Sequence, residues 1–72
     1  MEAPKVTGHR QLTHGEIALV NEGKAIAIQC GAFIDKLKAH PEVDQRWVSL
    51  GATHLQIGFM GVVRGITKPE TF

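Results

Sequence analysis

The sequence predicts an all-α fold: an antiparallel hairpin of two long helices, preceded by a short N-terminal arm. Three observations support this prediction. A helix-start signal occupies residues 13–16, an apolar pattern with helical spacing runs through residues 17–37, and Pro41 separates it from a second apolar stretch at residues 43–66. Because the connection between the two helices is short, they must lie side by side as an αα-hairpin.

The first 12 residues are expected to form an extended arm, since they contain a proline and a glycine and show no periodicity. The sequence THGE that follows has the form of a capping box. In this motif the Thr13 hydroxyl accepts the backbone N–H of Glu16, and the Glu16 carboxylate accepts the backbone N–H of Thr13. The first helix is therefore predicted over about residues 14–38.

The second helix is predicted over about residues 42–66. Pro41 disfavours helix at the residue before it, so the new helix starts either with Pro41 in its first turn or with Asp44 as its N-cap. The sequence TKP at residues 67–69 ends it. Residues 1–72 then form one hairpin domain, without an internal repeat or a linker.

A chain of 72 residues needs a further source of stability, because so short a chain buries only roughly 60 % of its unfolded surface. Disulfides, metals and oligomerisation are the usual sources. Cys30 is the single cysteine, and the histidines at positions 9, 14, 40 and 54 lie too far apart for an HxxxH metal pair. No metal or other cofactor is expected, and oligomerisation remains.

From Ile57 on, apolar residues surround the second helix, as expected of a helix that is buried on all sides in protein or in lipid. Lipid is the poorer option, since it would have to hold His54, Gln56 and Arg64, and a central arginine costs at least about 2.5 kcal/mol. The first helix is judged too polar to span a membrane. We therefore expect no membrane association and an apolar surface covered by other copies of the chain.

Six glycines interrupt the predicted helices, and each costs about 0.5–1 kcal/mol relative to alanine. Close approach between helices would offset this cost. The alternative is that some of the glycines are tolerated or bend the helix. The six are Gly23, Gly31, Gly51, Gly58, Gly61 and Gly65.

Catalysis has little support, and no enzymatic activity is expected. The sequence contains no nucleophile elbow, no P-loop and no tyrosine. Cys30 fits an inert thiol better than a nucleophile, His54 fits a core or interface residue better than a ligand, and Trp47 fits a core residue better than a binding platform. The net charge of +1 gives no basic field, so binding to polymeric nucleic acid is not expected either.

Two cations interrupt otherwise apolar helical stretches. Lys24 stands in the apolar stripe of the first helix, and Arg64 in the most apolar part of the second. A charge in such a position must find a partner or bind an anion. Alternatively, Lys24 reaches solvent or pairs with Glu16 or Glu22, and Arg64 pairs with Glu70 or with a neighbouring chain.

Two segments, HRQLTHGEIALVNEGKA and DQRWVSLGATHLQIGFMGVVRGI, carry a resemblance that spans about residues 8–72. They resemble the Acb/Tad hairpin domain of phage proteins that block cyclic-oligonucleotide immunity, in particular the short anti-CBASS sponge branch. The resemblance implies a compact homo-hexamer in the cytoplasm of the infected bacterial host. It also implies capture, without cleavage, of cyclic dinucleotides such as cyclic GMP-AMP, and of cyclic trinucleotides at a separate site near the symmetry axes, so that effectors are not activated.

The resemblance also implies site residues. The family's dinucleotide site uses an aromatic residue directly after a glycine in the arm and a lysine fifteen residues later, which here are His9 after Gly8, and Lys24 (24 − 9 = 15). Arg10 is expected to line the same pocket. The family's aromatic residue is tyrosine or phenylalanine, and imidazole offers less area for base stacking, which is worth roughly 1–3 kcal/mol per base.

For the trinucleotide site, the family's helix-2 arginine matches Arg64. The family places a hydroxyl residue about one turn later, where this chain has Lys68, with Thr67 adjacent. Lys68 would then serve as another phosphate donor, or the second site would be weakened. Apart from the resemblance, a structural oligomerising hairpin without a nucleotide ligand remains the alternative function.

Overall fold

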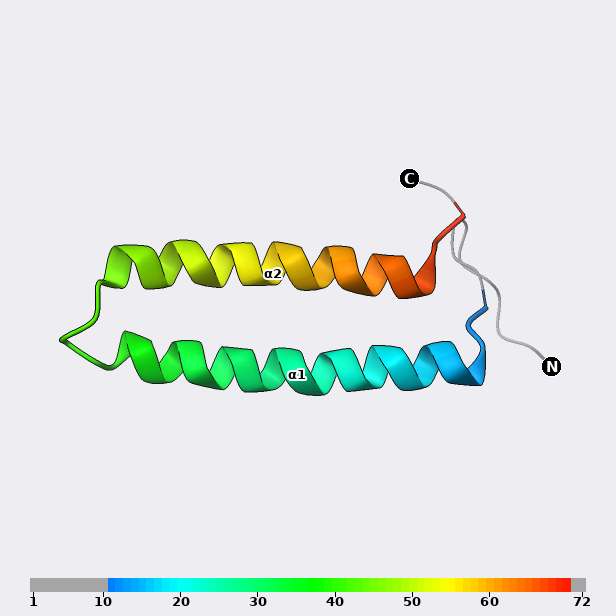
Figure 1. Cartoon of the computed structure of the whole chain (residues 1–72), viewed down its shortest axis with the longest axis horizontal. Coiled ribbons are helices and arrows are strands. Elements are labelled where there is room, and N and C mark those ends of the chain that lie inside the picture. Colours follow the sequence, from blue (N-terminus) through cyan, green and yellow to red (C-terminus); the bar gives the residue numbers. More distant parts are fainter. Residues whose placement is uncertain (1–10, 71–72) are drawn as a thin grey trace.

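The computed structural model describes residues 11–70, which form two antiparallel α-helices joined by a short turn (Figure 1). Helix α1 spans His14–Lys38 and helix α2 spans Gln45–Thr67. They lie side by side along nearly their whole length, and every regular element among the described residues is a helix. The fold is thus the all-α hairpin that the periodicity of the sequence predicts.

A capping box starts α1, as the THGE sequence predicts. The Glu16 backbone N–H donates to Thr13 Oγ1 at 3.1 Å, and the Thr13 N–H donates to Glu16 Oε1 at 2.8 Å. Each bond satisfies a backbone donor that has no partner within the helix itself. The helix therefore begins at His14.

Helix α2 begins after an Asp44 cap, which decides between the two starts that the sequence left open. Asp44 Oδ1 accepts the backbone N–H groups of Arg46 at 3.0 Å and Trp47 at 3.3 Å. The helix therefore starts at Gln45, about three residues later than expected, and Pro41 lies in the turn. An aspartate that accepts the first free N–H groups stabilises a helix start by about 1 kcal/mol.

One side chain joins the two helices at the turn. Gln45 Nε2 donates to the backbone carbonyls of Leu37 and His40, both at 3.0 Å. Leu37 lies in the last turn of α1, where the carbonyl groups lack partners within the helix, and His40 lies two residues after the helix ends. The first residue of α2 therefore also caps the end of α1 and keeps the turn short.

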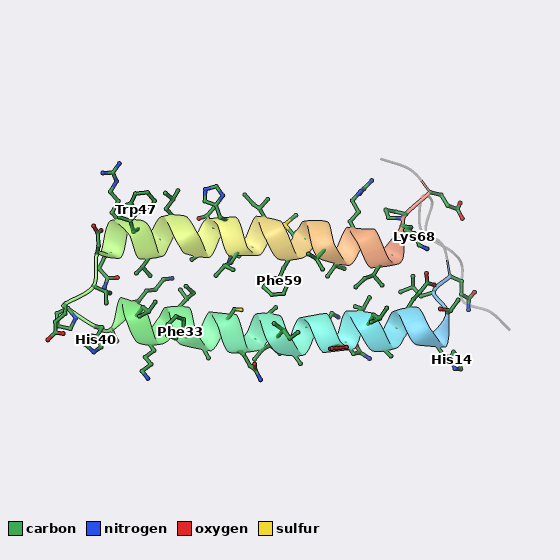
Figure 2. All side chains as sticks on the ribbon, viewed as in Figure 1. His14, Phe33, His40, Trp47, Phe59 and Lys68 are labelled. Atoms are coloured by element: carbon green, nitrogen blue, oxygen red, sulfur yellow. The ribbon has the colours of Figure 1, made fainter. Side chains whose placement is uncertain are left out.

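A line of half-buried residues on α1 faces α2. Phe59 on α2 points into the space between the helices (Figure 2). The spacing of the α1 line alternates between four and three residues, the pattern of helices that pack side by side like a coiled coil. Its members are Glu16, Val20, Gly23, Ala27, Cys30, Ile34 and Leu37.

The hairpin has no fully buried residue among those described, so two helices alone do not enclose a core. Large apolar side chains remain 41 % to 73 % exposed along both helices, which is far more than a short soluble chain can leave uncovered without a partner. Those exposed are Ile17, Leu19, Ile26, Ile28, Phe33, Trp47, Leu50, Leu55, Ile57, Met60 and Val62. Trp47 and His54, expected as core or interface residues, are exposed in the single hairpin.

The glycines are not explained by close approach of the two helices of one hairpin. A Cβ atom built at each of the six interrupting glycines meets nothing within 4 Å. This includes Gly23, which lies on the line that faces α2. The close approach expected at these glycines is therefore not made within the hairpin, and space for a neighbour is left at each of them.

Helix α1 is long and apolar enough, by length and composition, to cross a membrane. The expectation that it is too polar to span is wrong by this criterion, because the isoleucine, alanine and leucine residues outweigh Glu22 and Lys24. A helix of this composition is also typical of an oligomer interface, and none of it is buried within the hairpin. Composition alone thus does not separate the two environments.

Candidate functional site

Lys24 is exposed on one flank of α1. At 3.6 residues per turn, its side chain leaves the helix about a quarter turn away from the line that faces α2. Among residues 11–70 its ammonium has no ion pair, so the alternative pairing with Glu16 or Glu22 is not formed. Lys24 therefore presents a positive charge on the flank of a mostly apolar helix, where an anion can reach it.

Lys68 lies at the open end of the hairpin, which is the end opposite the turn, next to the start of α1. Its Nζ is 3.7 Å from Glu16 Oε2, in an ion pair whose lysine is 67 % exposed and whose glutamate is 17 % exposed. Glu16 thus has two roles, since its other oxygen accepts the Thr13 N–H of the capping box. The side chain of Glu16 joins the first residue after α2 to the first turn of α1.

The backbone at Lys68 is left-handed, with φ 44° and ψ 62°. This conformation turns the chain out of α2 and lets the Lys68 N–H donate to the Arg64 carbonyl at 2.8 Å. Glycine is the residue that takes this position most easily, because it has no Cβ to meet the following carbonyl. A lysine in this conformation therefore carries backbone strain that a glycine would not carry.

Arg64 is an exposed residue in the last turn of α2, one turn before Lys68. Two cations at the C-terminal end of a helix interact favourably with its dipole. Glu16 pairs with Lys68, and Glu70 follows two residues later in the chain, so the open end of the hairpin gathers both positive and negative side chains. This is a charged site, and an anionic ligand that used Lys68 would have to compete with Glu16.

The structure places the expected site residues in two separate regions. Arg64 and Lys68 lie together at the open end, whereas Lys24 lies further along α1, level with about residue 60 of α2. This level follows from the register of the Glu16–Lys68 pair (16 + 68 = 84 and 84 − 24 = 60). Gly8, His9 and Arg10 lie outside the described residues.

Sequence reasoning missed the link between Glu16 and Lys68. It treated Glu16 as a cap and as a possible partner of Lys24, not as the partner of a residue 52 positions away (68 − 16 = 52). The signal was available, since two antiparallel helices of similar length bring the first turn of one beside the end of the other. Among residues 11–70, no group of three or more His, Cys, Asp or Glu side chains could hold a metal ion.

The fold and the site define a class of protein: a small helical hairpin that leaves its apolar surface uncovered and carries cations on one flank and at its open end. The chain matches the family model described as Acb2/Tad1, hairpin domain, over residues 1–67 and belongs to that family. No curated protein sequence matches it. The matched range includes Lys24 and Arg64, and it ends immediately before Lys68.

Proposed function

We propose that this protein is an oligomeric sponge that binds cyclic oligonucleotide second messengers and withholds them from bacterial defence effectors. The observation that carries the proposal is its membership of the Acb2/Tad1 hairpin family over residues 1–67. The messengers are cyclic dinucleotides such as cyclic GMP-AMP, and cyclic trinucleotides at a second site. The protein then acts in the cytoplasm of the infected bacterial host, as a phage product that blocks CBASS effector activation.

The oligomer is a compact homo-hexamer in this proposal. Its support is the exposed apolar surface, because among residues 11–70 the single hairpin leaves eleven large apolar side chains at least 41 % exposed. The choice of an assembly in water over insertion in lipid rests on His54, Gln56 and Arg64 of α2, which are exposed and would have to lie in the lipid. A protein that stays in solution without detergent after cell lysis would agree with this choice, and one that needs detergent would reject it.

The dinucleotide site consists of Gly8, His9 and Arg10 from the arm together with Lys24. Lys24 supports this assignment because its charge is exposed and has no ion pair among residues 11–70. Its ammonium neutralises a phosphate, His9 stacks on a base, and Arg10 lines the pocket. Nanomolar capture needs about −12 kcal/mol, which phosphate contacts, stacked bases and exclusion of water between subunits together can supply.

The trinucleotide site uses Arg64 and Lys68 near a symmetry axis. Cations repeated around an axis suit a ring of phosphates, since each phosphate then meets an equivalent side chain. Glu16 opposes this use of Lys68, because the two side chains already pair at 3.7 Å. Lys68 would therefore have to leave Glu16 before it could join Arg64 at a phosphate.

No bond is made or broken in this mechanism, which works by mass action. The protein lowers the free messenger concentration when it binds more tightly than the effector and is present in excess. Sequestration without cleavage is distinguished from hydrolysis by recovering the intact ligand after the protein is denatured.

Native mass spectrometry with cyclic GMP-AMP and cyclic tri-AMP tests the proposal. We expect a hexamer that gains intact dinucleotide in stoichiometric number, with trinucleotide mass added independently. A hexamer that gains neither ligand would support the alternative of a structural oligomerising hairpin, which the exposed apolar surface favours as strongly. A monomer would reject both functions.

A further inference from the structure

One face of the hairpin combines a row of large side chains with a row of glycines. On α1, Leu19, Ile26 and Phe33 are spaced seven residues apart and are 53 %, 46 % and 57 % exposed. On α2, Gly51, Gly58 and Gly65 have the same spacing. Residues seven apart lie nearly above one another on a helix, so each set forms one row along its helix.

Both rows lie on the same face of the hairpin. Viewed along α1 from its N-terminus with α2 above, the residues of α1 advance clockwise and those of the antiparallel α2 advance anticlockwise, because both helices are right-handed. Relative to the direction that points from each helix to the other, both rows then lie on the left side of the hairpin. Figure 2 shows Phe33 in front of the α1 ribbon, on the face toward the viewer.

The two rows are also in register. The Glu16–Lys68 pair links residues whose numbers sum to 84, and antiparallel helices of equal rise keep this sum along their length. The three pairs formed by the rows obey the same sum (19 + 65, 26 + 58 and 33 + 51). Each large side chain on α1 is thus level with a glycine on α2 to within about one turn of helix, because the pair joins the tips of two long side chains.

We call the glycine row a groove because larger residues lie on either side of it around the helix. Leu55 and Val62 lie between the glycines and α1, and Trp47 and His54 lie on the outer side, by their positions around the helix. A Cβ at any of the three glycines meets nothing within 4 Å, so the groove is not filled by this hairpin. It has room for the side chains of another chain.

We propose that this face, named here the ridge-and-groove face, packs against the same face of a second copy. The two-fold axis runs along the length of the hairpin. Rotation about this axis places α1 of the partner over α2, at the same level along the hairpin. The ridge residues Leu19, Ile26 and Phe33 of each copy then enter the other copy's groove at Gly65, Gly58 and Gly51, and both hairpin turns lie at the same end of the pair.

The pattern favours this axis over the other two-fold arrangement that keeps the helices of the two copies aligned face to face. An axis across the hairpin would stack α1 on α1, so that one ridge met the other and the two grooves faced each other empty. Colliding side chains and unfilled space are both unfavourable in a packed interface. An axis along the hairpin instead matches a large side chain with a glycine at all three levels.

The surface area of the chain supports a second copy as the occupant. The chain exposes 6108 Å², whereas a compact monomer of 7.8 kDa exposes about 4,400 Å². The excess of about 1,700 Å² is larger than the roughly 800 Å² that each partner buries in a standard interface, so the chain has enough surplus surface for a second copy to cover. Lys24 lies on the opposite flank of α1 from the ridge-and-groove face.

This inference deepens the oligomer of the proposed function by assigning one of its interfaces. The experiment is done without nucleotide, so that failure of this interface can be distinguished from failure of the sponge function. Gly58→Leu fills the middle of the groove, and Gly61→Leu is its control three residues away on the outer side of α2. Neither Cβ meets anything within the hairpin, and leucine favours helix more than glycine does.

Light scattering and native mass spectrometry measure the assembly of each variant, and circular dichroism checks that the helices persist. We expect Gly58→Leu to raise the dissociation constant of the two-fold contact at least about tenfold, because the clash occurs twice in a symmetric interface. Gly61→Leu should leave this contact unchanged. Adding Ile26→Ala to Gly58→Leu should restore association, since the alanine of one copy makes room for the leucine of the other.

The fluorescence of Trp47, the one tryptophan of the chain, gives an independent measurement. It stands on the wall of the groove and is 66 % exposed in the single hairpin, so its emission should shift to the blue as the wild-type protein associates. A monomeric wild-type protein, equal assembly of the two glycine variants, or no rescue by Ile26→Ala would overturn the proposal. A wild-type oligomer that passes these tests but binds no cyclic nucleotide would overturn the sponge function alone.

Discussion

Lys68 and Glu16 form an ion pair of 3.7 Å that joins the end of α2 to the first turn of α1. This ion pair fixes how the two helices are aligned at the open end of the hairpin. The hydrogen bonds of Gln45 fix their alignment at the turn. The same two side chains lie where the cyclic trinucleotide site is proposed. In the proposed function, stability and trinucleotide binding therefore depend on the same pair of charges.

The backbone at Lys68 gives the first prediction. Lys68→Ala should lower the free energy of unfolding by up to about 1 kcal/mol, since an exposed ion pair contributes about 0–1 kcal/mol. Lys68→Gly should be at least as stable as the wild type, because glycine relieves about 1 kcal/mol of left-handed strain. Chemical denaturation at one fixed protein concentration checks both variants. Equal loss in the alanine and glycine variants would show that the left-handed backbone carries no strain.

Release of Lys68 from its carboxylate gives the second prediction. Glu16→Gln keeps much of the capping geometry but removes the charge that holds Lys68, so cyclic trinucleotide affinity should rise. Arg64→Ala should lower the same affinity roughly 10- to 100-fold, since a charge-assisted hydrogen bond is worth about 1.5–3 kcal/mol. Calorimetric titration with cyclic tri-AMP measures both variants. If Arg64→Ala bound cyclic tri-AMP with wild-type affinity, Arg64 would not belong to the site.

The exposed charge of Lys24 gives the third prediction. Lys24→Ala should abolish binding of cyclic GMP-AMP while the oligomer survives, because the ammonium contacts a phosphate and lies opposite the ridge-and-groove face. Lys36→Ala is the matched control, since Lys36 is also an exposed lysine on α1. Titration calorimetry reports binding, and light scattering reports assembly. Wild-type affinity for cyclic GMP-AMP in Lys24→Ala would contradict the assignment of Lys24 to the dinucleotide site.

The histidine in the arm gives the fourth prediction. Cyclic dinucleotide affinity should rise as the pH falls from about 8 to about 5.5, the range in which imidazole gains its proton. The protonated ring adds a cation–π contribution and attracts phosphate. His9→Phe should bind with an affinity that changes less over this range. A wild-type profile as flat as that of His9→Phe would reject a titrating stacking residue.

Much of the hairpin follows from short stretches of the sequence. The capping box Thr13–Glu16 and the helical period after it predict a first helix over residues 14–38, and α1 spans His14–Lys38. These features depend on contacts between residues three or four apart, which a sequence displays directly. The start of α2 was less certain because Pro41 and Asp44 both fit a first turn, and the Asp44 hydrogen bonds decide it.

The sequence by itself determined that this chain is helical, that two helices cannot enclose a core, and which family it belongs to. Only the tertiary structure decided that Lys68 meets Glu16, that the glycines leave open space, and that Ile26 lies level with Gly58. The reason is that these relations join residues far apart in the chain. These relations depend on how the two antiparallel helices are aligned and on which faces they turn toward each other. Neither can be seen in the spacing of residues along one helix.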